Sequence, residues 1–446
     1  MNGRFTILLL SCSAIFVCSI VNNLHDQDNL DSIDSMGREN HKLQTHVFRE
    51  RLPGLSSRTD IIKQGRVHQD LSHEVIFAIK QKNMDELRSI LHDVSDPSSL
   101  NYGQHMTREE VTDLTSNPEA RDVVVSYLNF IGASIKSITL GGEYITASAS
   151  ISIWESMFET EFYTFHQTHI GNRVGKVVRA EKYSIPRELD LHLEAVFNIV
   201  NLYQVSHGNL HPMKSSHLVK EKGITMQDNP GTPEWLEYHT ITPYRLKLYY
   251  NMSNNVRGVN FSTQAVFASY NYYFSHADGV AFRTMAGLPR QSIKFIKNAN
   301  DTICRVDSWR CFEGNLDLQY IMAMSPLSPT TYWYTDLDFI DWIVTVANIV
   351  NPPRVFSISY GHIEDTVDVE SRSIFTQQAM KLGAMGVTIL AATGDDGANG
   401  RTGSCRYAAN FPTVHPYVTA VGGTSVSENK IFCCHFIALV LISVFF

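Results

Sequence analysis

The chain has 446 residues, of which 43% are hydrophobic, and a formal net charge of -8 at pH 7. A chain of this length and composition can bury a sizeable core and form two or three globular domains. The acidic balance provides no positive surface for a phosphate backbone, and the sequence contains no stripe of basic and aromatic residues. Nucleic acid is therefore excluded as a partner.

The N-terminus has the layout of a secretory signal peptide, because Arg4 precedes an apolar run at 5–20 that is followed by polar residues. A short membrane anchor is the alternative. The run is shorter than the span of about 20 residues that a membrane helix needs, which favours cleavage. We expect a signal peptide at residues 1–21 and entry into the secretory pathway.

Two features farther along the chain agree with a secretory route. Cys304 and Cys311 are spaced to close a short loop, and an oxidising compartment favours such a disulfide. Triplets for N-glycosylation begin at Asn251, Asn260 and Asn300, and would mark exposed loops, although such triplets also arise by chance.

A region of short periodic elements follows a polar stretch that extends to about residue 65. The apolar periodicity predicts a strand at 75–79, helices at 83–94, from 107 onward and at 118–130, and a hairpin of strands at 135–139 and 144–149. Thr107 and Glu110 have the spacing of a capping box. We expect an α+β domain at 66–206 and then, at 207–237, a linker whose composition indicates exposure to proteases.

From about residue 238 the pattern changes to short apolar strands that alternate with helices. The predicted strands lie at 331–334, 355–360, 387–393 and 417–424, and the predicted helices at 339–350 and 371–386. This alternation indicates a parallel sheet that is covered on both faces. Ligand sites of such sheets lie where the strands end, and Gly394 and Asp395 directly follow a strand. An ordinary turn is the alternative explanation for these two residues.

Two acidic residues, Glu313 and Asp317, lie four positions apart in a predicted helix. Side chains at this spacing share one helix face, so two ionised carboxylates repel, the pKa of one is raised and a proton is shared. A solvated surface pair is the common explanation of such spacing. The apolar neighbours Phe312, Leu316 and Leu318 argue against it, because an acid on a largely buried helix needs a partner or a role.

Motifs for other chemistries do not occur in the sequence. There is no Gly-x-Ser-x-Gly elbow, Walker loop or dinucleotide fingerprint, and His73-Glu74 has no second histidine at the spacing of a zinc site. We therefore assign no metal-binding or cofactor-binding residue. His362 and His415 are expected to lie in loops or at the edge of the core.

Several segments resemble, in the right order, those of the sedolisins, or serine-carboxyl peptidases. They are 93–104 (DVSDPSSLNYGQ), 242–249 (TPYRLKLY), 313–322 (EGNLDLQYIM), 357–361 (SISYG), 393–398 (TGDDGA) and 411–425 (FPTVHPYVTAVGGTS). The resemblance implies a subtilisin-like parallel sheet for residues 238–430 and an α+β activation prodomain at 66–206. It also implies proteolysis in acid of peptide or protein substrates, in the lysosome or outside the cell, by either an exopeptidase or an endopeptidase.

The resemblance further implies roles for three carboxyl groups. Glu313 would be the general base for a serine hydroxyl, and Asp317 would hold Glu313 in place and tune its pKa. Asp395, when protonated, would donate a hydrogen bond to the oxyanion of the tetrahedral intermediate. A carboxylic acid donates only in its neutral form, so this design favours acidic pH.

The sequence departs from the family pattern after Lys430. The nucleophile box Gly-Thr-Ser-Ala-Ser does not occur, and neither does the C-terminal region that holds calcium in the family. Calcium is expected for the family, but no ligand for it is assigned here. Ser425 belongs to an earlier structural box and is not expected to be the nucleophile. The atypical hydrophobic tail at 431–446 is shorter than a membrane span but able to enter an interface.

We therefore expect a peptidase precursor that is cut short before its nucleophile and is inactive as written. Three alternatives remain open. The chain is a noncatalytic protein that binds a peptide or a peptidase, or a form tethered to a membrane by its tail, or a truncated domain that does not fold stably.

Overall fold

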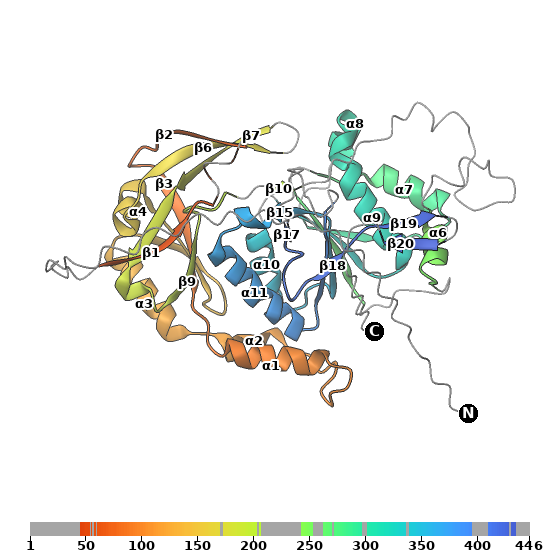
Figure 1. Ribbon diagram of the computed structural model, residues 1–446, viewed down its shortest axis with the longest axis horizontal. Coiled ribbons are helices and arrows are strands. Elements are labelled where there is room, and N and C mark those ends of the chain that lie inside the picture. The colour runs from red at the N-terminus through yellow and green to blue at the C-terminus, as the bar shows by residue number, and fades with distance from the viewer. Residues whose placement is uncertain are drawn as a thin grey trace, which may run out of the picture. The chain divides into compact units, whose positions relative to one another are not determined.

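The protein is represented by a computed structural model, drawn in Figure 1. It describes residues 45–53, 55, 58, 60–169, 173–202, 205–206, 242–252, 262–269, 272–296, 301–335, 339–394, 409–427 and 430–433. Several predicted features lie outside the described residues: the signal peptide at 1–21, the linker at 207–237, Asp395, Asn260 and Asn300, and the tail after Cys433.

A four-stranded antiparallel sheet is the centre of the N-terminal region, the name used here for the described residues 45–206. Its strands are, in order, β4 (Ser134–Ile138), β5 (Tyr144–Ser150), β3 (Ser72–Ile79) and β9 (Leu193–Phe197). Phe77 of β3 is buried against Trp154 and Phe158, with ring centroids 5.9 and 6.2 Å apart. These aromatic contacts are part of the hydrophobic core of this region.

Three helices of the N-terminal region begin close to where the sequence predicts: α1 (Met84–Ser95), α2 (Arg108–Thr115) and α3 (Pro118–Phe130). The helix α4 (Ile151–Phe158) and the short 3-10 helix η2 (Arg187–Leu189) were not predicted. The capping box is present, since Thr107 Oγ1 accepts from Glu110 N at 3.2 Å and the Glu110 carboxylate accepts from Thr107 N at 2.7 Å. The predictions of α1, α2, α3 and the β4–β5 hairpin are confirmed.

The remaining strands of this region were not predicted. They are β1 (His46–Arg51), β2 (Ile61–Arg66), β6 (Phe162–His169), β7 (Arg173–Ala180), β8 (Lys182–Pro186) and β10 (Val205–Ser206), as well as β9. β1 pairs with β8, and β6 lies between β2 and β7. β1 and β2 carry many charged residues and pair with strands far along the chain, so no element was predicted in the polar stretch before residue 65.

A six-stranded parallel sheet is the centre of the C-terminal region, which comprises the described residues from 242 to 433. Its strands are, in order, β12 (Ile293–Ile296), β13 (Thr330–Tyr334), β11 (Gln264–Ala268), β14 (Val355–Ile358), β16 (Thr388–Ala392) and β18 (Thr419–Val421). All of the pairings within it are parallel. The predicted parallel sheet is confirmed, with strand ends that differ by a few residues.

Helices cover both faces of this sheet, as predicted. They are α6 (Pro243–Tyr249), α7 (His276–Met285), α8 (Asp301–Val306), α9 (Phe312–Met324), α10 (Phe339–Ala347) and α11 (Val369–Ala384), with short 3-10 helices η4 (Ser308–Cys311) and η5 (Glu364–Thr366). Along β11, Phe267 packs with α10 and α11, whereas its neighbours Val266 and Ala268 pack with α9. This alternation follows from the two-residue repeat of a strand.

Two small sheets complete the region. β15 (Gly361–Ile363) lies between β10 and β17 (Asn410–Phe411), and β19 (Thr424–Ser427) pairs with β20 (Lys430–Cys433). Within the described ranges, every helix is too short or too polar to span a bilayer.

Three buried carboxyl groups, those of Glu50, Asp368 and Glu370, surround the first turn of α11. Their donors are Val369 N for Glu50 (2.7 Å), Ser371 N and Asn201 Nδ2 for Asp368 (2.7 and 2.8 Å), and Arg49 Nε and Val196 N for Glu370 (2.7 and 2.9 Å). Several of these donors belong to the N-terminal region, so the cluster joins that region to α11.

The last turns of α11 also contact the N-terminal region. Lys381 forms a buried ion pair with Glu143. Apolar side chains of the two regions belong to one hydrophobic cluster, with Leu87, Leu91 and Val111 on one side and Met380 and Leu382 of α11 on the other. The N-terminal region and the parallel sheet therefore share part of their core across α11.

Candidate active site

The first turns of helix α9 bury a carboxyl group and expose two apolar side chains. The side chain of Glu313 is buried, at 6% exposure, whereas its apolar neighbours Phe312 and Leu316 are 42% and 39% exposed. The sequence predicted apolar burial around the acids, and for Phe312 and Leu316 this was wrong. A carboxylate that is buried while apolar groups face water costs free energy, so the arrangement indicates a functional constraint.

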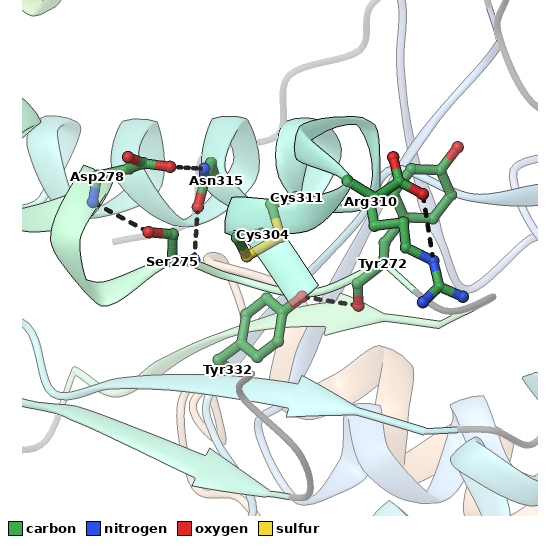
Figure 2. The surroundings of a disulfide bond; sticks show 9 residues. Tyr272, Ser275, Asp278, Cys304, Arg310, Cys311, Asn315 and Tyr332 are labelled. Atoms are coloured by element: carbon green, nitrogen blue, oxygen red, sulfur yellow. Dashed lines mark hydrogen bonds and ion pairs between the residues drawn. A yellow bond between two sulfur atoms is a disulfide. The ribbon is translucent and has the colours of Figure 1, made fainter. Parts of the chain in front are cut away.

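The start of α9 is held by a disulfide. Cys304 of α8 is bonded to Cys311, the residue before α9, with Cα atoms 5.5 Å apart. This confirms the loop closure that their spacing suggested. Figure 2 shows that Cys311 lies close to the Asn315 turn of the helix. The bond restrains the first turn of α9, which carries Glu313.

A second restraint on α9 comes from Asn315. Its Oδ1 accepts from Ser275 N at 2.9 Å and its Nδ2 donates to Asp278 Oδ2 at 2.9 Å, as drawn in Figure 2. Ser275 caps α7, since its hydroxyl accepts from Asp278 N at 3.1 Å. Asn315 therefore ties α9 to the beginning of α7.

Gly314 lets α9 approach the sheet closely. A Cβ atom at this position would lie 2.5 Å from both Tyr273 O and Tyr332 Oη. Tyr332 belongs to β13, and its hydroxyl donates to Tyr272 O at 3.3 Å. Only glycine allows this contact, which sets the depth at which Glu313 and Asp317 lie against the strand ends.

The carboxyl group of Asp317 has few partners. Its Oδ1 accepts from Ser359 Oγ at 2.7 Å. Its Oδ2 is buried and has no donor among the described residues. Burial, and then the nearby charge of Glu313, raise the pKa of Asp317 well above its ordinary value, whereas the bond from Ser359 opposes the shift. The predicted perturbation of one acid is confirmed, with burial as the larger cause.

The site lies at the carboxyl ends of parallel strands. Tyr273 follows β11, Ser359 follows β14, and Gly394 follows β16. Gly394 has a φ of +91°, and Asn410 Nδ2 donates to Thr393 O beside it at 2.7 Å. The structure therefore brings Glu313 and Asp317 together and leads the chain up to Asp395, which is outside the described residues.

The other candidate residues are placed as follows. Asn251 is described and exposed, directly after α6. Ser425 lies on β19, opposite Phe432 of β20. His362 lies on β15 and His415 in the turn after β17; both are buried, and burial lowers the pKa of His415 to about 4. No group of three metal-ligating side chains comes together within the described ranges, so calcium remains an expectation without assigned ligands.

Ser359 was not singled out from the sequence. It contacts Asp317 across 42 positions of the chain, a distance that no local pattern reports. A signal for it was present, because it follows an apolar strand within the segment 357–361, and polar residues just past parallel strands are site candidates.

Comparisons with known proteins agree with this organisation. The model of the pro-kumamolisin activation domain matches residues 59–202. Tripeptidyl-peptidase 1 of Mus musculus is 27% identical over 387 residues, covering 82% of this chain and 63% of its own length. The Homo sapiens protein is 27% identical over 386 residues, covering 82% of this chain and 64% of its own length. The chain thus spans less than two thirds of these relatives.

A solved structure of Pseudomonas sedolisin, a serine-carboxyl proteinase in complex with pseudo-iodotyrostatin, is 18% identical. It covers 42% of this chain and 56% of its own chain with a TM-score of 0.34, too low to support an argument.

The chain therefore contains a segment that matches a pro-kumamolisin activation domain, followed by a mixed α/β region with a parallel sheet. Over most of its length it is similar to tripeptidyl-peptidase 1.

Proposed function

We propose that the chain is the precursor form of an acid-active serine-carboxyl peptidase of the tripeptidyl-peptidase type, with a subtilisin-like catalytic domain. Glu313 is the general base, Asp317 positions it, and Asp395 is the oxyanion donor. The observation that carries the proposal is the acid pair of α9, in which Glu313 and the Oδ2 atom of Asp317 are buried, restrained by a disulfide and by Gly314.

The chemistry of the pair supports a base on Glu313. Two carboxylates in a dry site cannot both keep a negative charge at low cost. Burial raises the pKa of Asp317 and so favours the shared proton on that side chain; Glu313 would then be the partner that accepts a proton from a serine hydroxyl. Asp395 donates to an oxyanion only while protonated, so the complete site works in acid.

The 446 residues contain no Gly-Thr-Ser-Ala-Ser box. We therefore expect this polypeptide, assayed alone, to have no peptidase activity, because a base without its nucleophile cannot start acyl transfer. The peptide or protein substrates, and the choice between exopeptidase and endopeptidase, belong to the proposal and rest on the similarity to tripeptidyl-peptidase 1.

A secretory and lysosomal destination is also part of the proposal. The disulfide between Cys304 and Cys311 supports folding in an oxidising compartment. The exposure of Asn251 supports its use as a glycosylation site. Calcium is expected from the family, and no step of the mechanism is derived through it.

A chimera tests the activity. Residues 1–424 are joined to the segment that follows the corresponding Val-Gly-Gly-Thr box of human tripeptidyl-peptidase 1, and release of tripeptides from a fluorogenic peptide is measured in acid. We expect turnover by the chimera and none by the 446-residue chain. Glu313→Gln should lower kcat/KM of the chimera by at least about 100-fold, the usual contribution of a general base.

Glu86→Gln, an exposed acid on α1, is the matched control and should leave turnover unchanged. A folded chimera without activity would overturn the peptidase proposal. Full activity of Glu313→Gln would overturn the role of Glu313, and turnover by the unmodified chain would show that its nucleophile lies within the 446 residues.

A further inference from the structure

The contact between Ser359 and Asp317 restricts where a proton can reside in the acid pair. Ser359 Oγ lies 2.7 Å from Asp317 Oδ1, and the carboxyl group of Glu313 is within hydrogen-bonding reach of Asp317. If both acids were ionised, the two carboxylates would offer only acceptors to each other. Asp317 Oδ2 would then stay buried without a donor, as the described residues leave it.

A proton on Oδ2 removes this conflict. Oδ2 then donates to the negatively charged carboxylate of Glu313, while Oδ1 continues to accept from Ser359. A proton on Oδ1 would instead point at Ser359 and leave Oδ2 unprotonated beside the charge of Glu313. The arrangement with the proton on Oδ2 satisfies both oxygens, and the Ser359 hydroxyl is the group that selects it.

Among the described residues, the groups that perturb Asp317 include no cation. The groups that act on Asp317 are Glu313 and Ser359, and the phenols of Tyr332 and Tyr360 are buried close enough to interact with both acids. Burial raises the pKa of each of these phenols well above 10, so both stay neutral. With no positive charge among the groups that perturb Asp317, the hydrogen bond from Ser359 is the polar contact that orients its carboxyl group.

We propose that Ser359 is a positioning residue, whose hydroxyl holds Asp317 Oδ1 as an acceptor and thereby directs the shared proton through Oδ2 onto Glu313. The inference rests on the proposed function, because it describes how Glu313 is oriented as the base. It acts through Asp317 and requires no contact between Ser359 and a substrate.

The protonation of Asp317 tests this in the full chain without any catalytic assay. Aspartate labelled with ¹³C at the side-chain carboxyl carbon is titrated by NMR, and Asp317→Asn identifies the signal of Asp317. Ser359→Ala should move the midpoint upward by about one pH unit, which corresponds to about 1.4 kcal/mol for a hydrogen bond to a charged acceptor. Ser359→Thr keeps the hydroxyl and should restore the midpoint.

Ser373→Ala is the matched control, since Ser373 Oγ donates to the Glu194 carboxylate at 2.6 Å away from the site. It should leave the Asp317 midpoint unchanged. If Ser359→Ala does not fold, Ser359→Cys provides a weak donor of similar size and should shift the midpoint in the same direction. An unchanged midpoint in the folded Ala or Cys variant would overturn the proposal.

A double variant tests whether Ser359 orients the carboxyl group of Asp317 toward Glu313 or merely lies near it. If Ser359 directs the proton toward Glu313, then Glu313→Gln should change the Asp317 midpoint less in the Ser359→Ala background than in the native one. Additive shifts would overturn the orienting role. These titrations require no turnover, so the two proposals can fail separately. An inactive chimera together with a shifted Asp317 midpoint would reject the peptidase function but not the contact of Ser359 with Asp317. An active chimera together with an unchanged midpoint would reject the role of Ser359 alone.

Discussion

The protein contains two groups of buried acids that differ in how completely they are hydrogen-bonded. Around the first turn of α11, Glu50, Asp368 and Glu370 all accept from backbone or side-chain donors. In α9, Asp317 has one donor, and its Oδ2 has none among the described residues. Burial raises the pKa of an acid in both groups. A raised pKa alone therefore does not distinguish the proposed catalytic acids from the structural ones, whereas the number of donors to Asp317 among the described residues does.

The two groups of acids also differ in the parts of the molecule that hold them in place. The acids at α11 join the N-terminal region to the parallel sheet, and their donors come from both sides of that contact. The acids of α9 are held by the disulfide, by Asn315 and by Gly314, so the backbone is fixed while a carboxyl oxygen is left open. In the proposed mechanism, this oxygen of Asp317 carries the proton that is shared with Glu313 and must therefore be free of other donors.

Breaking the contact at α11 should have the largest effect on stability. Lys381→Met leaves Glu143 buried without its cation, which should lower the free energy of unfolding by about 3 to 5 kcal/mol. Urea unfolding monitored by circular dichroism measures the change. The double variant Lys381→Met, Glu143→Leu should recover most of the loss, because no uncompensated charge remains.

Arg88→Ala, which removes an exposed ion pair with Asp85 and a hydrogen bond to Tyr417, is the control and should lower the free energy of unfolding much less. If Lys381→Met cost no more than this control, the ion pair would not stabilise the contact.

The acids at α11 should also make stability depend on pH. Burial, and then the charges of Asp368 and Glu370, raise the pKa of Glu50 from 4.5 to about 9. Between these values the folded protein keeps a proton that the unfolded chain has lost. The stabilisation is complete below the unfolded pKa and is lost as pH rises toward 9, by at most about 1.4 kcal/mol per pH unit.

Glu50→Gln should remove this part of the pH dependence, so the variant gains stability relative to the native protein as pH rises. Unfolding free energies at about pH 5 and about pH 8 give the difference that linkage predicts. Glu86→Gln on α1 is again the exposed control. Parallel curves for Glu50→Gln and the native protein would show that Glu50 does not retain its proton.

The close approach of α9 can be tested at Gly314. Gly314→Ala places a methyl group 2.5 Å from Tyr273 O and Tyr332 Oη, so the helix must move, at a cost of about 1 to 3 kcal/mol. Thermal unfolding measures the loss. Gly65→Ala on β2 meets nothing within 4 Å and should behave like the native protein. Equal melting temperatures for both variants would contradict the close packing of α9.

The smallest expected effect concerns which of two causes, burial or the charge of Glu313, raises the pKa of Asp317 more. Glu313→Gln removes the like charge beside Asp317, so the pKa of Asp317 should fall. It should remain above its ordinary value, because burial is the larger cause. The labelled-aspartate titration measures both quantities. A fall into the ordinary range would show that the charge of Glu313, and not burial, dominates the site.

The sequence predicted those elements whose signals are local. α3 is bounded by Asn117 and Pro118, α2 by a capping box, and the parallel strands are apolar throughout. The strands β1 and β2 were missed because each gains its stability from a partner distant in sequence. Likewise, the spacing of Glu313 and Asp317 revealed the pair, while the exposure of Phe312 and the contact of Ser359 depend on tertiary packing that no spacing encodes.

The hydrophobic cluster that spans α11 makes cleavage and separation two distinct events. A protease that cuts between residues 206 and 242 breaks one covalent connection, but Leu87, Leu91 and Val111 stay packed with Met380 and Leu382. The cut protein should therefore persist as a noncovalent complex of two fragments. Its lifetime is set by the rate at which this buried surface and the charges beside it become hydrated, so release of the activation domain is a dissociation reaction rather than a consequence of proteolysis.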